Sequence, residues 1–257
     1  MSRTLARALH GIARAATAAM KPARRASTLA LLHEATLQEV AVPTSAGVLR
    51  VLCPSNRALH DPQGFGRDEP ETVAWIESLP ADAVLWDIGA NIGLYALFAA
   101  RRGLRVLAFE PSAASFAAMV ASAEANGLDR LVDAYCLALD EAPGLARLEM
   151  ASSAAGHSMH SIAGAPGRFS QAVLAMTVDG LVGQGAPAPT HIKLDVDGIE
   201  AAILRGAKAT LAGVREVLVE VEGATAEAEI PILLEAAGLH PKGQGGRNRL
   251  YGRSDRI

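Results

Sequence analysis

Short apolar runs alternate with longer segments of helical periodicity along most of this chain. The apolar runs predict buried strands at residues 83–86, 104–109, 131–139, 191–194 and 214–221. Apolar residues recur at intervals of three and four between these runs, and this spacing predicts helices at 93–102, 113–126, 199–211 and 230–237. Because strands and helices alternate, the sequence predicts an α/β domain with a mainly parallel sheet.

Weaker patterns surround this core. They predict two short strands within 36–52, a helix that begins at 68–72, an extra strand at 145–150 and an edge strand at 249–252. Residues 152–170 are small, polar and rich in turn formers, which predicts a long loop. Loops of this length inside a compact domain are often functional.

The first 33 residues differ from the rest of the chain in charge. They contain six arginines and lysines and no acid, while Leu5, Leu9 and Ile12 recur at helical spacing. We interpret residues 1–33 as a basic leader, helical or disordered, and residues 34–257 as the folded domain. One role for the leader is weak contact with an anionic membrane surface, or import. The favoured alternative is a loosely docked leader whose charges are solvated.

Composition narrows the class of protein. The chain has 257 residues, of which 50% are hydrophobic, so it can bury a sizeable core. The net charge of -3 is nearly balanced and gives no reason to expect a nucleic-acid partner. No apolar stretch approaches the ~20 residues of a membrane span. Cys53 and Cys136 match no zinc or redox spacing, so we expect free thiols and a cytoplasmic location.

The first strand ends in an acid, and a glycine-containing turn follows it. Asp87 lies where open α/β sheets bind ligands, and Gly89 and Gly93 let the backbone approach a ligand closely. The turn reads Asp-x-Gly-x-Asn-x-Gly instead of Gly-x-Gly-x-x-Gly. A carboxylate would repel a pyrophosphate but suits the ammonium of a methionine moiety. The turn therefore favours S-adenosylmethionine over a dinucleotide, and the alternative is a purely structural turn.

The second strand also ends in an acid. Glu110 follows Asp87 by 23 positions, the offset at which a carboxylate accepts hydrogen bonds from ribose hydroxyls in dinucleotide folds. Pro111 prevents the strand from continuing, and we count it with the cofactor residues. The alternative is a solvated acid at a strand end.

Three further acids gather after the fourth predicted strand, at Asp195, Asp197 and Glu200. They could supply a general base, position a substrate or bind a divalent ion. The alternative is that Asp197 caps the next helix while Glu200 pairs with its dipole. We take Asp195 and Glu200 as catalytic candidates and assign no metal site. His160, in the predicted loop, is a further candidate base because its ordinary pKa suits proton transfer.

The motifs together resemble the FkbM-type family of class I S-adenosylmethionine-dependent methyltransferases. The resemblance rests, in order, on residues 86–95, 109–111, Asn126, 177–181, 192–200 and 218–221. It covers roughly residues 68–253. It implies a Rossmann-like, doubly wound sheet of seven strands and, typically, O-methylation of a hydroxyl on a sugar or secondary metabolite.

The resemblance also implies roles for individual residues. Asp87, Gly89, Asn91 and Gly93 would form the cofactor loop, Glu110 would hold the ribose, and Asp195 would lie beside the transferred methyl. The chain departs from the family pattern at Asp197, where glutamate is expected. The shorter side chain keeps the charge but reduces the reach.

These observations predict an S-adenosylmethionine-dependent methyltransferase that acts on a hydroxyl of a small molecule, sugar or glycan. One alternative is an NAD(P)-dependent oxidoreductase, but its Gly-x-Gly-x-x-Gly turn is absent after the first strand. The other is an inactive methyltransferase fold that serves as a binding module. The intact set of glycines and acids argues against it.

Overall fold

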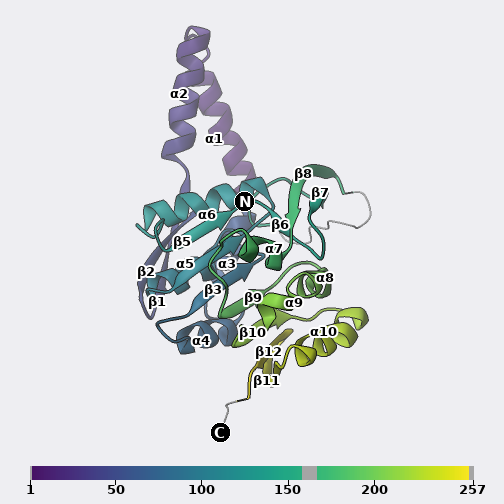
Figure 1. The fold of residues 1–257 in the computed structure, drawn as a ribbon. Coiled ribbons are helices and arrows are strands. Elements are labelled where there is room, and N and C mark those ends of the chain that lie inside the picture. Colours follow the sequence, from purple (N-terminus) through teal and green to yellow (C-terminus); the bar gives the residue numbers. More distant parts are fainter. Residues whose placement is uncertain (1, 158–166, 255–257) are drawn as a thin grey trace. The chain divides into compact units, whose positions relative to one another are not determined.

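The computed structural model describes residues 2–157 and 167–254 of the chain. The chain divides into two compact units, Met1–Gln38 and Glu39–Ile257. The first unit contains helices α1 (Ser2–Ala16) and α2 (Pro22–Ala35), drawn in purple in Figure 1. Pro22 lies at the first position of α2, where its missing N–H costs no hydrogen bond. None of the described helices is both long and apolar enough to cross a membrane.

A twisted sheet forms the centre of the second unit (Figure 1). In the described residues its order is β11-β12-β10-β9-β3-β4-β5. These strands are β3 (Val84–Ile88), β4 (Arg105–Phe109), β5 (Val132–Tyr135), β9 (His191–Leu194), β10 (Glu216–Glu220), β11 (His240–Gly245) and β12 (Asn248–Gly252). Neighbouring strands from β5 to β10 are parallel, and β12 is antiparallel to both of its neighbours. The predicted seven-stranded, mainly parallel sheet is confirmed.

Helices cover the central strands on both faces. Leu85 and Val106 pack into one core cluster, which includes apolar residues of α5 (Leu94–Arg101) and α6 (Ala113–Ala125). Trp86 and Leu107 point the other way, into a second cluster with α8 (Glu200–Arg205) and α10 (Ala224–Ala236). Strands buried on both faces read as continuous apolar runs, which is why the sequence predicts them clearly.

The order of the strands reverses beside β3. The chain runs outward from β3 to β4 and β5, and then returns to place β9 on the other side of β3. In doubly wound sheets the crevice at such a reversal, at the carboxyl ends of the strands, is where ligands bind. The fold therefore places the ends of β3 and β9 at the expected ligand site.

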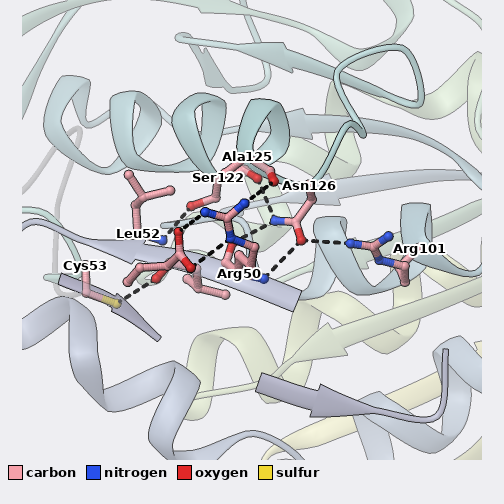
Figure 2. A network of polar contacts seen from close by, with 9 residues as sticks. Arg50, Leu52, Cys53, Arg101, Ser122, Ala125 and Asn126 are labelled. Carbon is pink, nitrogen blue, oxygen red and sulfur yellow. Dashed lines mark hydrogen bonds and ion pairs between the residues drawn. The ribbon is translucent and has the colours of Figure 1, made fainter. Parts of the chain in front are cut away.

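The two short strands predicted within residues 36–52 are β1 (Gln38–Thr44) and β2 (Gly47–Cys53). They form a hairpin, and β2 packs against α6. Figure 2 shows the polar contacts that hold it. The Arg50 N–H donates to Asn126 Oδ1 at 3.0 Å, and Asn126 Nδ2 donates to the Arg50 carbonyl at 2.7 Å. The Leu52 N–H donates to Ser122 Oγ at 2.9 Å. The Asn126 amide thus pairs with β2 as a neighbouring strand would.

Several predicted elements need correction. The strand predicted over 131–139 is wrong in its second half, because β5 ends at Tyr135, where its partner β4 also ends. β6 (Ala138–Leu139) instead joins β8 (Phe169–Met176) and β7 (Gly144–Met150) in a second sheet. The helix predicted over 199–211 is interrupted at Gly206, whose backbone touches Asp140, and α9 (Lys208–Leu211) follows.

Other elements of the structure are absent from the prediction or longer than predicted. β11 and most of β8 lie outside the predicted strands, and α10 begins six residues before the predicted helix. Two further helices are α4 (Pro70–Ser78), at the predicted start, and α7 (Val178–Gly183). The side chain of Thr177, which precedes α7, accepts a hydrogen bond from the Gly180 N–H.

Candidate active site

A cavity of about 470 Å³ opens at the carboxyl ends of β3, β4, β9 and β10. The 3-10 helix η1 (Arg57–Leu59) and α3 (His60–Gly64) contribute to its wall. Six of the predicted site residues line it, namely Asp87, Gly89, Asn91, Glu110, Pro111 and Asp195. Residues more than a hundred positions apart in the sequence therefore meet at one site.

Three predicted site residues have a different placement. Gly93 lies at the start of α5, just behind the cavity wall. Glu200 is buried, and its carboxylate accepts a hydrogen bond from the Gly198 N–H at 3.2 Å, as a residue that orders the turn before α8 would. His160 lies outside the described residues. His157, which precedes it, lines the cavity.

The two glycines of the first turn are required by the packing of the chain itself. Gly89 has a φ of +83°, and a Cβ there would overlap the backbone oxygen of Asp195. Gly93 has a φ of +82°, and a Cβ there would lie 2.5 Å from Met119 Cγ in α6. From the sequence, these glycines are expected because they let the backbone approach a ligand closely. The structure adds a second reason, because β3 and β9 end in direct backbone contact at Gly89.

Glu110 connects the end of β4 to the first turn. Its Oε2 accepts a hydrogen bond from the Asn91 N–H at 2.9 Å, and its Oε1 accepts one from the Ser112 N–H at 2.7 Å. Burial raises the pKa of the Glu110 carboxyl to about 7, although both N–H donors oppose the shift. Each oxygen of a carboxylate can accept more than one hydrogen bond, so a ligand hydroxyl can still bind there.

Asp87 is buried at the end of β3 without a hydrogen bond. Among the described residues neither carboxylate oxygen has a partner at ordinary hydrogen-bond geometry, although the Ala96 N–H lies near enough to lower the pKa slightly. Lys193 Nζ lies 3.9 Å from Asp87 Oδ1, which is close enough for electrostatic attraction. Burial raises the pKa of Asp87 to about 6, with Lys193 acting in the opposite direction. Such an unsatisfied buried carboxylate, lining a cavity, indicates a missing ligand donor.

Lys193 is one of the site residues that the sequence patterns do not single out, together with Arg57 and Glu220. Its buried ammonium lies 2.7 Å from Asp195 Oδ2 and 5.3 Å from the centre of the Tyr95 ring. Burial lowers the pKa of Lys193, but the carboxylates of Asp195 and Asp87 raise it by more. The pKa therefore lies well above its ordinary value. A lysine in the middle of a short apolar strand, two residues before an acid, is the signal that could have revealed it.

A second pair of acids meets at the ends of β9 and β10. The carboxyls of Asp195 and Glu220 lie close enough to shift each other's pKa, with that of Asp195 lowered and that of Glu220 raised. Burial and the neighbouring Asp195 raise the pKa of Glu220 to about 7. Burial also raises the pKa of Asp195, but Lys193 lowers it more, so Asp195 stays ionised. Arg247 binds the pair from outside, with Nε 3.0 Å from Glu220 Oε1.

Negative charge dominates the lining of the cavity. It includes nine acidic side chains and three arginines or lysines. The acids are Asp61, Asp68, Glu69, Asp87, Glu110, Asp195, Asp197, Glu220 and Glu222. Within the part of the chain that the structure describes, no cluster of three acids, histidines or cysteines has the arrangement of a metal site. The excess of acids over basic residues suits a positively charged ligand.

Comparison with known proteins identifies the class of this fold and site. Residues 87–240, more than half of the chain, match the Methyltransferase FkbM domain. The chain therefore belongs to the FkbM methyltransferase family, with the Rossmann-like fold of class I methyltransferases. The resemblance noted in the sequence is confirmed.

Two relatives extend this comparison. The chain is 31% identical over 178 residues to the hexuronic acid methyltransferase AglP of Haloferax volcanii, an alignment that covers 64% of this chain and 66% of AglP. It also resembles the crystal structure of an FkbM methyltransferase from Methylobacillus flagellatus KT, with a TM-score of 0.50 and 15% identity. That match covers 68% of this chain and 45% of the other. The chain thus spans less than two thirds of either relative.

Proposed function

We propose that this protein is an S-adenosylmethionine-dependent methyltransferase that methylates a hydroxyl of a sugar, glycan or other small molecule. The observation that carries the proposal is the buried carboxylate of Asp87, which has no partner at ordinary hydrogen-bond geometry and lies beside Glu110 in the crevice of an FkbM domain. A bound cofactor with an ammonium and ribose hydroxyls supplies the donors that these two acids lack.

The residues at the ends of β3 and β4 fit this cofactor. We assign the ribose hydroxyls to Glu110, whose oxygens keep free lone pairs, and the ammonium to Asp87. Asn91, Gly89 and Gly93 shape the turn between them, and Pro111 lines the cavity next to Glu110. The cofactor brings an already electrophilic methyl group, so the protein has to bind, orient and exclude water.

The acceptor hydroxyl must lose a proton during the transfer, and we assign that proton to the Asp195–Glu220 pair. Both carboxyls line the cavity, and Lys193 holds Asp195 in its ionised form. With a pKa of about 7 at Glu220, the pair becomes fully ionised above neutral pH and can accept a proton. His160 and Glu200 remain predictions from the sequence, with Glu200 engaged in its own turn.

Among the possible acceptors we favour a uronic acid, because the name of AglP gives hexuronic acid as the substrate of that protein. The acidic lining would repel a uronate unless one cation were free to bind it. Lys193 and Arg247 are already paired with acids. Arg57 lines the cavity as an exposed residue. In the described part of the chain its guanidinium donates no hydrogen bond, although its charge lowers the pKa of the nearby Asp61. We therefore assign the uronate carboxylate to Arg57.

Calorimetric titration with S-adenosylhomocysteine tests the proposal, with Glu110→Ala as the control. We expect binding to the wild type and strong weakening in the variant. Binding of NADH without binding of S-adenosylhomocysteine would instead favour an oxidoreductase. Binding without methyl transfer to any of a panel of glucuronides, galacturonides and neutral glycosides would favour the inactive binding module.

A further inference from the structure

One side of helix α1 presents large apolar side chains to solvent. Leu5, Leu9 and Ile12 are 62%, 57% and 64% exposed. Their spacing of four and three residues places them on one face of the helix. Single exposed apolar residues are common on protein surfaces, whereas a row on one helix face is typical of helices that lie at an apolar interface.

The opposite side of α1 is basic. At about 100° per residue, Arg3, Arg7 and Arg14 lie across the helix from the row of Leu5, Leu9 and Ile12. The helix contains no acid, and Lys21, Arg24 and Arg25 add further positive charge near the start of α2. The helix therefore combines an apolar face with a purely cationic one.

The helical unit has almost no core of its own that could stabilise α1. In the described residues of this unit only Thr17 is buried, and none of the residues of α2 is. The Thr17 hydroxyl donates to the Ala13 carbonyl at 2.9 Å. This bond lies at the carboxyl end of α1 and is local, so it does not join α1 to another element. Isolated helices of about 15 residues are marginal in water, so an apolar surrounding would stabilise this one.

We propose that α1 lies in the interface of a membrane that contains anionic lipids. The leucine face would enter the boundary of the acyl chains, and the arginines would bind the lipid phosphates. Charge complementarity favours this partner over a second copy of the chain, because two copies of α1 would bring like charges together. Because only three large apolar residues would enter the membrane, we expect weak and reversible binding. Because the arginines contribute through their charge, we expect salt to reduce it.

Vesicle co-sedimentation of the full chain tests this proposal. The vesicles contain phosphatidylcholine alone or phosphatidylcholine with a quarter of phosphatidylglycerol. We expect binding to the anionic vesicles only, and its loss at high salt. Leu9→Asp should weaken binding by about tenfold or more, because it removes apolar area and adds a negative charge. Leu145→Asp, at a residue of β7 that is 93% exposed, is the matched control and should bind as the wild type does.

The outcome does not depend on the methyltransferase proposal. Both variants should keep the circular dichroism spectrum and the melting temperature of the wild type, which shows that the larger unit is folded. Equal binding to both kinds of vesicle, no binding to either, or equal loss in both variants would overturn the proposal. A dimer in light scattering that Leu9→Asp dissociates would also overturn it, in favour of a second copy as the partner of α1.

Discussion

Ionisation of Glu110 should destabilise the folded protein in the absence of ligand. Burial raises the pKa of this carboxyl from 4.5 to about 7. Between these two values the folded state keeps a proton that the unfolded state has lost. Because the folded state binds more protons there, the free energy of unfolding falls as the pH rises from about 4.5 to about 7, and stays low above it.

The size of the effect follows from the shift. One pKa unit corresponds to about 1.4 kcal/mol, so this shift corresponds to about 3 kcal/mol of stability lost at pH 8 relative to pH 4.5. The side chain is buried, so screening by solvent does not reduce the figure much. Glu110→Gln removes the titration, but its amide NH₂ would face the N–H of Asn91 or Ser112, which costs about 1–3 kcal/mol. The quantity to measure is therefore the change in the free energy of unfolding between two pH values, compared between the wild type and Glu110→Gln.

Urea unfolding at pH 5 and pH 8 measures this difference. Between the two pH values the wild type should lose about 2–3 kcal/mol more than Glu110→Gln does. Glu124→Gln, at an exposed glutamate of α6, controls for the change in net charge and should follow the wild type. The same Glu110→Gln variant should bind S-adenosylhomocysteine about tenfold more weakly or worse. Equal losses in the wild type and in Glu110→Gln would refute the reasoning.

Further variants test the architecture of the site. Gly89→Ala should lower the melting temperature far more than Gly103→Ala, because both have positive φ but only the first meets a backbone oxygen. Asn126→Ala removes the side-chain amide that pairs with β2 and should cost about 2 kcal/mol in urea unfolding, whereas a loss under 0.5 kcal/mol (an order-of-magnitude limit) would mean that the pairing is dispensable. Lys193→Met leaves the buried carboxylate of Asp87 and the half-buried one of Asp195 without their cation and should cost about 3 kcal/mol at pH 8 and less at pH 5. Arg57→Gln should reduce methylation of glucuronides and spare neutral glycosides, and an equal effect on both would remove its proposed role.

The parts of the fold that the sequence predicts well are those whose burial dictates their composition. β3, β4 and β9 are buried on both faces, and each is an apolar run that ends beside an acid. The positions of Asp87, Glu110 and Asp195 follow from those strand ends. Their convergence on one cavity follows from the parallel order of the strands, which periodicity alone does not give.

The elements that escaped prediction lack such a constraint. β11 has the sequence His-Pro-Lys-Gly-Gln-Gly and no buried side chain, so it pairs with β12 through its backbone and an exposed hydrogen bond from Arg249 to Gln244. The role of Lys193 is equally hidden, because its partner on the neighbouring strand is Asp87, more than a hundred residues earlier. Only the register of β3 against β9 shows that this lysine lies between two acids.

The charges at the centre of the site explain why these acids are buried despite their cost. One ammonium, that of Lys193, serves two carboxylates, those of Asp87 and Asp195, so the group keeps an excess negative charge in a low dielectric. Buried charge without full compensation is unfavourable in the ligand-free protein. A cationic ligand supplies the missing positive charge, and part of its binding free energy is the relief of that imbalance. Burial raises the pKa values of Asp87 and Glu110, and it also makes a further negative charge, such as that of a pyrophosphate, costly beside them. This argument agrees with the cofactor proposed above, which carries a sulfonium and an ammonium.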